Sequence, residues 1–180
     1  MPYTEEYVNH EELRKTLLLA GIREIEKHGI NGFSLRRIAT ECGVSCAAPY
    51  RHFESKSDFV FEVIAYVNSQ WGLLKEQIVS MFSNDKKRLI TELCVATVLF
   101  WRANPNFKHI VMLDDGLLDN DQIKEKNRIT DEICAMTRDF SNGKETEKTV
   151  FMIKALLYGA AADSSTDINL IKDCIESVLD

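Results

Sequence analysis

Residues 33–56 read FSLRRIATECGVSCAAPYRHFESK, and the spacing of their side chains decides the fold. Ser34 is a predicted N-cap for a short helix whose apolar side chains recur at steps of three and four residues. Gly43 supplies a left-handed residue of the kind that ends a helix, and Ser45 is the next predicted N-cap. A second short helix is predicted over Cys46–Phe53. Two short helices that are joined by a tight turn and end in aromatic and basic residues are typical of a DNA-reading helix-turn-helix.

Helical patterns continue on both sides of this stretch. A first helix is predicted over about Glu11–His28, ended by Gly29. After the turn, Ser55-Lys56-Ser57-Asp58 forms a capping pattern that starts a long helix, and Asn104-Pro105 is a further helix start. Strand alternation is absent throughout, so the sequence predicts an all-α protein of about nine helices.

The composition favours a helical protein that is large enough to bury a hydrophobic core. The chain has 180 residues, a hydrophobic fraction of 45% and only three prolines. No stretch has the eighteen or more uncharged apolar residues of a membrane helix, and the acidic start MPYTEEYVNHEELRK lacks a signal-peptide core. Five cysteines are an odd number, which suits reduced thiols rather than a disulfide framework. We therefore expect a cytoplasmic protein that does not enter a membrane.

The net charge of −6 is unevenly distributed along the chain. Residues 10–56 carry eight lysines and arginines against six acids, whereas the chain from residue 61 onward carries fourteen against nineteen. The excess of acidic residues thus lies in a region that need not contact phosphate groups. A solvated surface of mixed sign explains this modest asymmetry about as well.

Residues 10–60 resemble the DNA-binding region of the TetR family of bacterial transcriptional repressors. The residues that carry the resemblance are Arg14, Leu17, Leu18, Ala20, Ile25, Gly29, Ser34, Ile38, Ala39, Gly43, Val44, Ser45, Tyr50, His52, Phe53, Ser55 and Lys56. The sequence departs from the family pattern at Glu24, where an apolar residue is usual, at Ala47, and at Pro49 within the second helix. The resemblance implies a three-helix DNA-binding domain over residues 1–56 and a larger helical effector-binding and dimerisation domain over residues 57–180.

The resemblance also implies roles for individual side chains. The helix Cys46–Phe53 would enter the major groove, and Arg36 would reach a guanine edge or a phosphate. Tyr50, His52 and Lys56 are similar to the family's phosphate clamp. The residues expected to contact DNA are Ser34, Arg36, Arg37, Ser45, Cys46, Ala47, Ala48, Pro49, Tyr50, Arg51, His52 and Lys56. Among them Arg37 has the alternative of a solvent-facing charge, and Phe53 is expected to be a core anchor.

The region after residue 60 is expected to hold a small apolar or amphipathic effector and to form a homodimer. Candidate effector-binding residues are Tyr66, Trp71, Phe100, Trp101, Phe107 and Met136, although ordinary core packing would use the same residue types. The stretch Val150–Ala162, with small residues at its end, and the stretch Asp167–Leu179 form the expected dimer surface. A buried helix within one chain is the competing interpretation of the first stretch.

These features together predict a dimeric repressor that binds a palindromic double-stranded operator and is released by a ligand. The alternative is a helical protein-interaction module, or an activator of the same fold that has no inducer. Neither a nucleophile elbow, a phosphate loop nor a dinucleotide fingerprint occurs, so the sequence favours no enzyme. It also indicates no cofactor and no metal site, since the four histidines are dispersed and Cys42 and Cys46 lack a second ligand pair.

Overall fold

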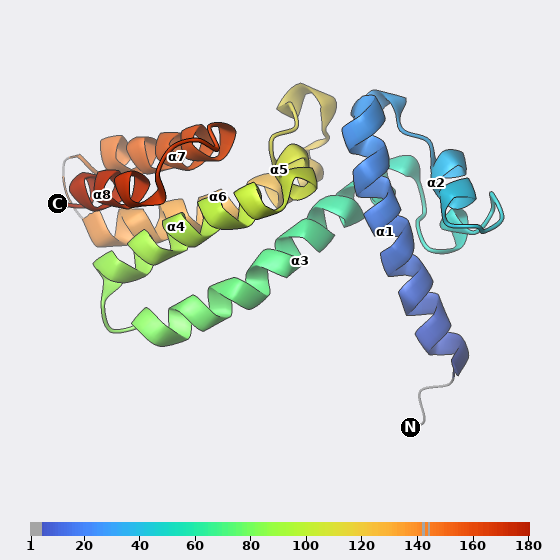
Figure 1. Ribbon diagram of the computed structural model, residues 1–180, viewed down its shortest axis with the longest axis horizontal. Coiled ribbons are helices and arrows are strands. Elements are labelled where there is room, and N and C mark those ends of the chain that lie inside the picture. Colours follow the sequence, from blue (N-terminus) through green and yellow to red (C-terminus); the bar gives the residue numbers. More distant parts are fainter. Residues whose placement is uncertain (1–4, 142, 144) are drawn as a thin grey trace. The chain divides into compact units, whose positions relative to one another are not determined.

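The computed structural model describes residues 5–141, 143 and 145–180, and within these ranges it contains helices and no strand (Figure 1). The α-helices of the described chain are α1 (Glu5–Gly32), α2 (Leu35–Glu41), α3 (Lys56–Phe82), α4 (Lys86–Ala103), α5 (Pro105–Val111), α6 (Asn120–Ser141), α7 (Thr146–Ala162) and α8 (Ile168–Val178). Two 3-10 helices, η1 (Pro49–Arg51) and η2 (Asp115–Leu117), complete them. The all-α prediction is confirmed, and the expected count of about nine helices is close to the eight α-helices described.

The chain divides into two compact units. The first comprises the residues up to Val67 together with His109–Lys126, and the second comprises Asn68–Lys108 and Asn127–Asp180. The first unit therefore contains the whole helix-turn-helix region. The functional division predicted between residues 56 and 57 remains a prediction.

The core of the first unit is built around aromatic rings. Phe59 of α3 is fully buried, and its ring lies edge-on to Phe53 at 4.8 Å and stacked on Phe33 at 5.8 Å. Gly21 of α1 is required at this point, because a Cβ atom there would lie 2.3 Å from the Phe59 ring. The expected core role of Phe53 is confirmed by its exposure of 2%.

Helix α1 is longer than predicted and is interrupted near its end. Gly29 takes a positive φ of 69°, as expected for a glycine that ends a helix, and a short helical segment continues to Gly32. The start of α3 agrees with its predicted cap, since the Ser55 hydroxyl accepts a hydrogen bond from the Asp58 amide at 2.9 Å. The Asp58 carboxylate in turn accepts one from the Glu54 amide.

Hydrogen bonds attach the segment 109–126 to the base of α3 within the first unit. The Ser57 hydroxyl donates to Asp119 at 2.7 Å, and the Gln122 side-chain amide donates to the Ser57 carbonyl at 2.9 Å. The amino group of Lys126, buried with 7% exposure, donates to the Leu113 carbonyl and pairs with Asp115. These contacts explain why a distant stretch of sequence joins the helix-turn-helix unit.

In the second unit α4, α7 and α8 pack against one another (Figure 1). Trp101 of α4 is 1% exposed and stacks on Tyr158 of α7 at 5.8 Å. The neighbouring Arg102 donates to the carbonyls of Ala160, Asp163 and Thr166, so one guanidinium caps the end of α7 and holds the loop that leads to α8. In the described ranges, no helix has both the length and the apolar character needed to cross a bilayer.

Candidate nucleic-acid interface

The turn between α2 and the following segment has the geometry predicted for it. Gly43 has φ of 69°, the Val44 amide bonds to the Ala39 carbonyl at 3.0 Å, and the Gly43 amide bonds to Thr40 at 3.1 Å. This pair of bonds is the Schellman arrangement, which ends α2 and turns the chain sharply. The Ser34 hydroxyl caps the other end of α2 by accepting a bond from the Arg37 amide.

The segment Cys46–Phe53, called the recognition segment below, differs from its prediction as a regular α-helix. It forms turns followed by the single 3-10 turn of η1, with bonds from Ala48 to Ser45 and from Arg51 to Ala48. Pro49 is the physical reason, because its nitrogen carries no hydrogen and cannot donate to the Ser45 carbonyl as an α-helix would require. The segment instead uses hydrogen bonds between residues three positions apart, which wind it more tightly than an α-helix.

The expected DNA-contacting residues divide by exposure. The exposed ones are Arg36, Arg37, Ser45, Cys46, Ala47, Tyr50, Arg51 and Lys56. Ser34 and His52 are partly exposed, whereas Ala48 and Pro49 are buried against the rest of the unit. Tyr50 stands out, since 62% of this large aromatic residue is open to solvent. The recognition segment therefore presents a tyrosine and basic groups, while its two central small residues pack inward.

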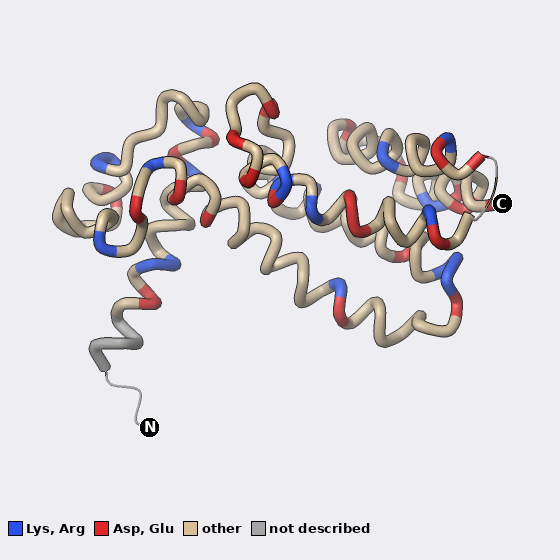
Figure 2. Tube along the Cα trace, turned by 180° about the vertical axis from the view of Figure 1, so that it is seen from behind, with Lys and Arg blue, Asp and Glu red and all other residues tan. Residues whose placement is uncertain are grey.

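Ion pairs separate the arginines of the first unit into two groups. Arg14 pairs with Glu62, Arg23 with Glu41 and Arg37 with Glu24. Among the described residues, the guanidinium groups of Arg36 and Arg51 have neither an ion pair nor a hydrogen bond. Figure 2 shows acidic and basic positions intermingled along this unit, so the unpaired arginines matter more than the net charge.

His52 lies against α1 rather than free in solvent. Its ring centre is 4.0 Å from that of His10, and its Nδ1 atom is buried without a hydrogen-bond partner among the described residues. Burial is the main cause that lowers the pKa of His52 below the ordinary histidine value, and electrostatic interactions with His10 and Arg14 lower it further. The neutral imidazole is thus favoured in the free protein.

Lys56 occupies the first position of α3. Its amino group lies 4.2 Å from the centre of the Phe33 ring, a cation–π contact that still leaves the residue exposed. The ammonium group is accordingly held in a defined place at the edge of the recognition segment, where a phosphate oxygen could approach it.

The candidate effector-binding residues do not form one group. Trp71, Phe100 and Phe107 make a continuous aromatic contact in the second unit, with ring centres 5.7 Å and 5.9 Å apart. Trp101 instead stacks on Tyr158, and its indole nitrogen is buried without a hydrogen-bond partner in the described chain. Met136 is partly exposed on α6, and Tyr66 belongs to the first unit.

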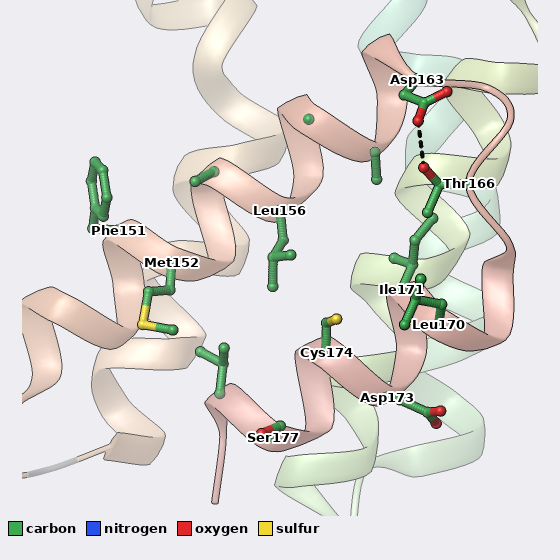
Figure 3. Close-up of a pocket in the computed structure, with 14 residues that line it drawn as sticks. Phe151, Met152, Leu156, Asp163, Thr166, Leu170, Ile171, Asp173, Cys174 and Ser177 are labelled. Carbon is green, nitrogen blue, oxygen red and sulfur yellow. Dashed lines mark hydrogen bonds between the residues drawn. The ribbon is translucent and has the colours of Figure 1, made fainter.

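An apolar groove of about 790 Å³ runs between α7 and α8. Figure 3 shows its walls, with Phe151, Met152 and Leu156 on α7 and Leu170, Ile171 and Cys174 on α8. Phe151 is 72% exposed and Leu170 is 55% exposed, so the groove presents large apolar side chains to solvent. Both stretches predicted as a dimer surface contribute to this groove.

Comparison with known proteins agrees with the helix-turn-helix geometry. Residues 17–63 match the family model of bacterial regulatory proteins of the tetR family. The HTH-type transcriptional regulator AcrR of Shigella flexneri is 29% identical over 85 residues, which are 47% of this chain and 40% of that protein. The match thus spans less than half of this relative's length.

Solved structures extend the similarity in fold to nearly the whole chain. The transcriptional regulator FadR from Bacillus subtilis, in complex with stearoyl-CoA, superposes with a TM-score of 0.71 at 13% identity over 92% of this chain and 96% of that one. AibR, in complex with isovaleryl coenzyme A and operator DNA, superposes with a TM-score of 0.69 at 16% identity over 91% and 96% of the two chains. The helix-turn-helix region of the chain, residues 17–63, thus matches the tetR family of bacterial regulatory proteins, and the chain shares the fold of these solved structures.

Proposed function

We propose that this protein is a DNA-binding transcriptional regulator, and specifically a cytoplasmic repressor that binds a near-palindromic operator as a homodimer. The observation that carries the proposal is the exposure of Tyr50, Arg51 and Arg36 around one sharp turn, with both guanidinium groups unpaired among the described residues. A major groove admits an element of this size, and arginine matches the acceptor pair of guanine.

Individual roles follow from the geometry of the first unit. Lys56 and Tyr50 supply contacts to phosphate oxygens, which set affinity and register. Arg36 reads a base edge, and Arg51 contacts either a base or the backbone. Ala48 and Pro49 are left out of the proposed interface because they are buried.

The second subunit is proposed to sit on the groove between α7 and α8. One recognition segment covers only a few base pairs, so useful specificity requires two copies related by a two-fold axis. The groove offers Phe151 and Leu170 as exposed apolar anchors. Gly159 leaves room for a partner helix, since no described atom lies within 4 Å of a Cβ placed there, apart from its chain neighbours and the backbone of its own helix. A copy of the same groove is therefore a fitting occupant.

The proposed effector is an amphipathic molecule with an acyl chain. The FadR and AibR structures contain acyl-coenzyme A ligands, and the Trp71, Phe100 and Phe107 contact provides an apolar surface of suitable chemistry in the second unit. Binding would favour a conformation in which the two recognition segments are wrongly spaced for the operator. Both tryptophans of the chain, Trp71 and Trp101, lie in this unit. Titration with stearoyl-CoA should accordingly change the tryptophan fluorescence, whereas free coenzyme A should not.

DNA binding can be tested by fluorescence anisotropy with duplex DNA from the region flanking the protein's own gene. The affinity should fall steeply as salt rises, because phosphate contacts release counterions. Lys56→Ala should weaken binding to all duplexes alike, whereas Arg36→Ala should also relax the preference for the flanking DNA over a scrambled duplex by about tenfold. Lys86→Ala, an exposed site on α4 in the second unit, is the matched control.

Two results would contradict the proposal. The first is an absence of binding by the wild-type protein at low salt, which would favour a protein-interaction module of the same fold. The second is an identical effect of Arg36→Ala and Lys56→Ala on flanking and scrambled DNA, which would remove the assigned base contact.

A further inference from the structure

Glu24 is a buried carboxylate at a position of α1 where an apolar side chain would be the ordinary choice. Its exposure is only 6%, and it lies between the buried residues Ile22 and Ile25 on the inner side of the helix. A buried carboxylate is costly unless it is paired and hydrogen-bonded. The position therefore needs partners, and the structure supplies them.

Three groups from the α2 side of the unit and from α1 itself surround this carboxylate. Its Oε1 atom accepts from the Arg37 guanidinium at 2.6 Å and from the Ser34 backbone amide at 3.2 Å. The His28 ring nitrogen lies 3.6 Å from Oε2. Arg37 also donates to the Gly32 carbonyl at 2.6 Å, so one network joins α1, the loop before α2 and the first turn of α2.

The network fixes the direction of Arg37 although half of that side chain is exposed. Its guanidinium is turned toward Glu24 and the Gly32 carbonyl, and its charge is cancelled there. Successive residues of an α-helix point about 100° apart, so holding Arg37 sets the rotation of the first turn of α2 and hence the direction of its neighbour Arg36. Arg36 is exposed and has no ion pair in the described chain.

We propose that Glu24 is a positioning residue for DNA reading. It withdraws Arg37 from the phosphate backbone and anchors the α2 N-terminus, so that Arg36 alone of the two arginines faces the duplex. This inference rests on the proposed DNA-binding function and assigns Arg37 an internal role in place of the DNA contact expected from the sequence.

The test compares Glu24→Gln, Arg37→Met, Arg36→Met and Lys56→Ala by anisotropy over a range of salt concentrations, with flanking and scrambled duplexes as probes. Lys56→Ala, which removes a proposed phosphate contact, should reduce the logarithmic salt slope by about one, whereas Arg37→Met should leave the slope unchanged. Arg36→Met should lower the preference for flanking DNA, because it removes the proposed base contact. Glu24→Gln frees the Arg37 charge and should raise the slope by up to about one. It should also lower the preference for flanking DNA, because the first turn of α2 loses its fixed direction.

A double variant separates positioning from stability. Glu24→Met with Arg37→Met removes both charges at similar volume, which often preserves or improves folding. Its melting temperature should therefore be close to that of the wild type while its preference for flanking DNA remains reduced. If the Glu24–Arg37 ion pair only stabilised the fold, the double variant would instead prefer flanking DNA as strongly as the wild type does.

Four outcomes overturn the inference. A fall in salt slope for Arg37→Met equal to that for Lys56→Ala would make Arg37 a phosphate contact. The positioning role of Glu24 would be ruled out if Glu24→Gln kept the salt slope and the preference for flanking DNA of the wild type. It would also be ruled out if the double variant kept the wild-type preference. Failure of the wild-type protein itself to bind either duplex at low salt would overturn the proposed function and this inference together, so the two failures are distinguishable.

Discussion

Replacement of Phe151 by alanine should weaken the proposed dimer without harming the monomer fold. The ring is 72% exposed in the single chain and lines the groove between α7 and α8. Complete burial of a phenylalanine side chain is worth about 1.5–3 kcal/mol, so burial of the exposed part is worth about 1–2 kcal/mol. A two-fold interface buries both copies, which gives about 2–4 kcal/mol and a rise in the dimer dissociation constant of about 30- to 1,000-fold.

Sedimentation velocity over a series of protein concentrations measures this constant directly. The matched control is Leu73→Ala on α3, because Leu73 is exposed to a similar extent, 66%, but does not line the groove. Circular dichroism should give both variants the helix content of the wild type. Equal dissociation constants for Phe151→Ala and the wild type, or a wild-type protein that is monomeric at every concentration, would refute the assignment of the groove.

Further predictions concern stability and its dependence on pH. Gly21→Ala should lower the free energy of unfolding by up to about 2 kcal/mol, because overpacking against Phe59 costs about 1–3 kcal/mol and helix propensity returns about 1 kcal/mol. Gly72→Ala should raise the free energy of unfolding by up to about 1 kcal/mol, because a Cβ there would meet no described atom within 4 Å apart from its chain neighbours and its own helix backbone. Equal effects of the two substitutions in urea titrations would contradict this packing. His52 has a lowered pKa in the folded state, so the unfolded state binds more protons, and the free energy of unfolding should fall as the pH drops below the ordinary histidine pKa of about 6.5. His52→Gln should flatten this part of the plot of unfolding free energy against pH. An unchanged slope in the variant would show that His52 is not the cause. Arg102→Met should destabilise the protein by roughly 2 kcal/mol and should speed amide hydrogen exchange in the loop between α7 and α8. Unchanged exchange in this loop would show that the hydrogen bonds from Arg102 to the carbonyls do not hold it in place.

Local signals in the sequence are sufficient to predict much of the helix-turn-helix. The stop at Gly43 and the caps at Ser34 and Ser55 depend on residues within a few positions of one another, so pattern reasoning finds them. Pro49 is a local signal as well, because proline lacks the amide hydrogen that an α-helix uses. A proline near the start of so short a segment was enough to replace α-helical bonding with a 3-10 turn.

Long-range pairings were beyond the same reasoning. Glu24 was visible as a departure from an apolar pattern, but its partner Arg37 is thirteen positions away and is identified only by the fold. The attachment of the segment 109–126 to Ser57 is likewise set by tertiary contacts. Aromatic composition gave candidate effector-binding residues after residue 60, yet it could not tell that Trp101 stacks on Tyr158.

Methylation interference on the bound duplex tests the central claim most directly, since it reports contacts at the guanine N7 atom in the major groove. The account predicts that methylated guanines block binding in two clusters on one face of the DNA, separated by one helical turn or a multiple of it. It also predicts that Arg36→Met abolishes interference at one guanine in each cluster. A protein that retards the duplex without any interference in the major groove would contradict the account.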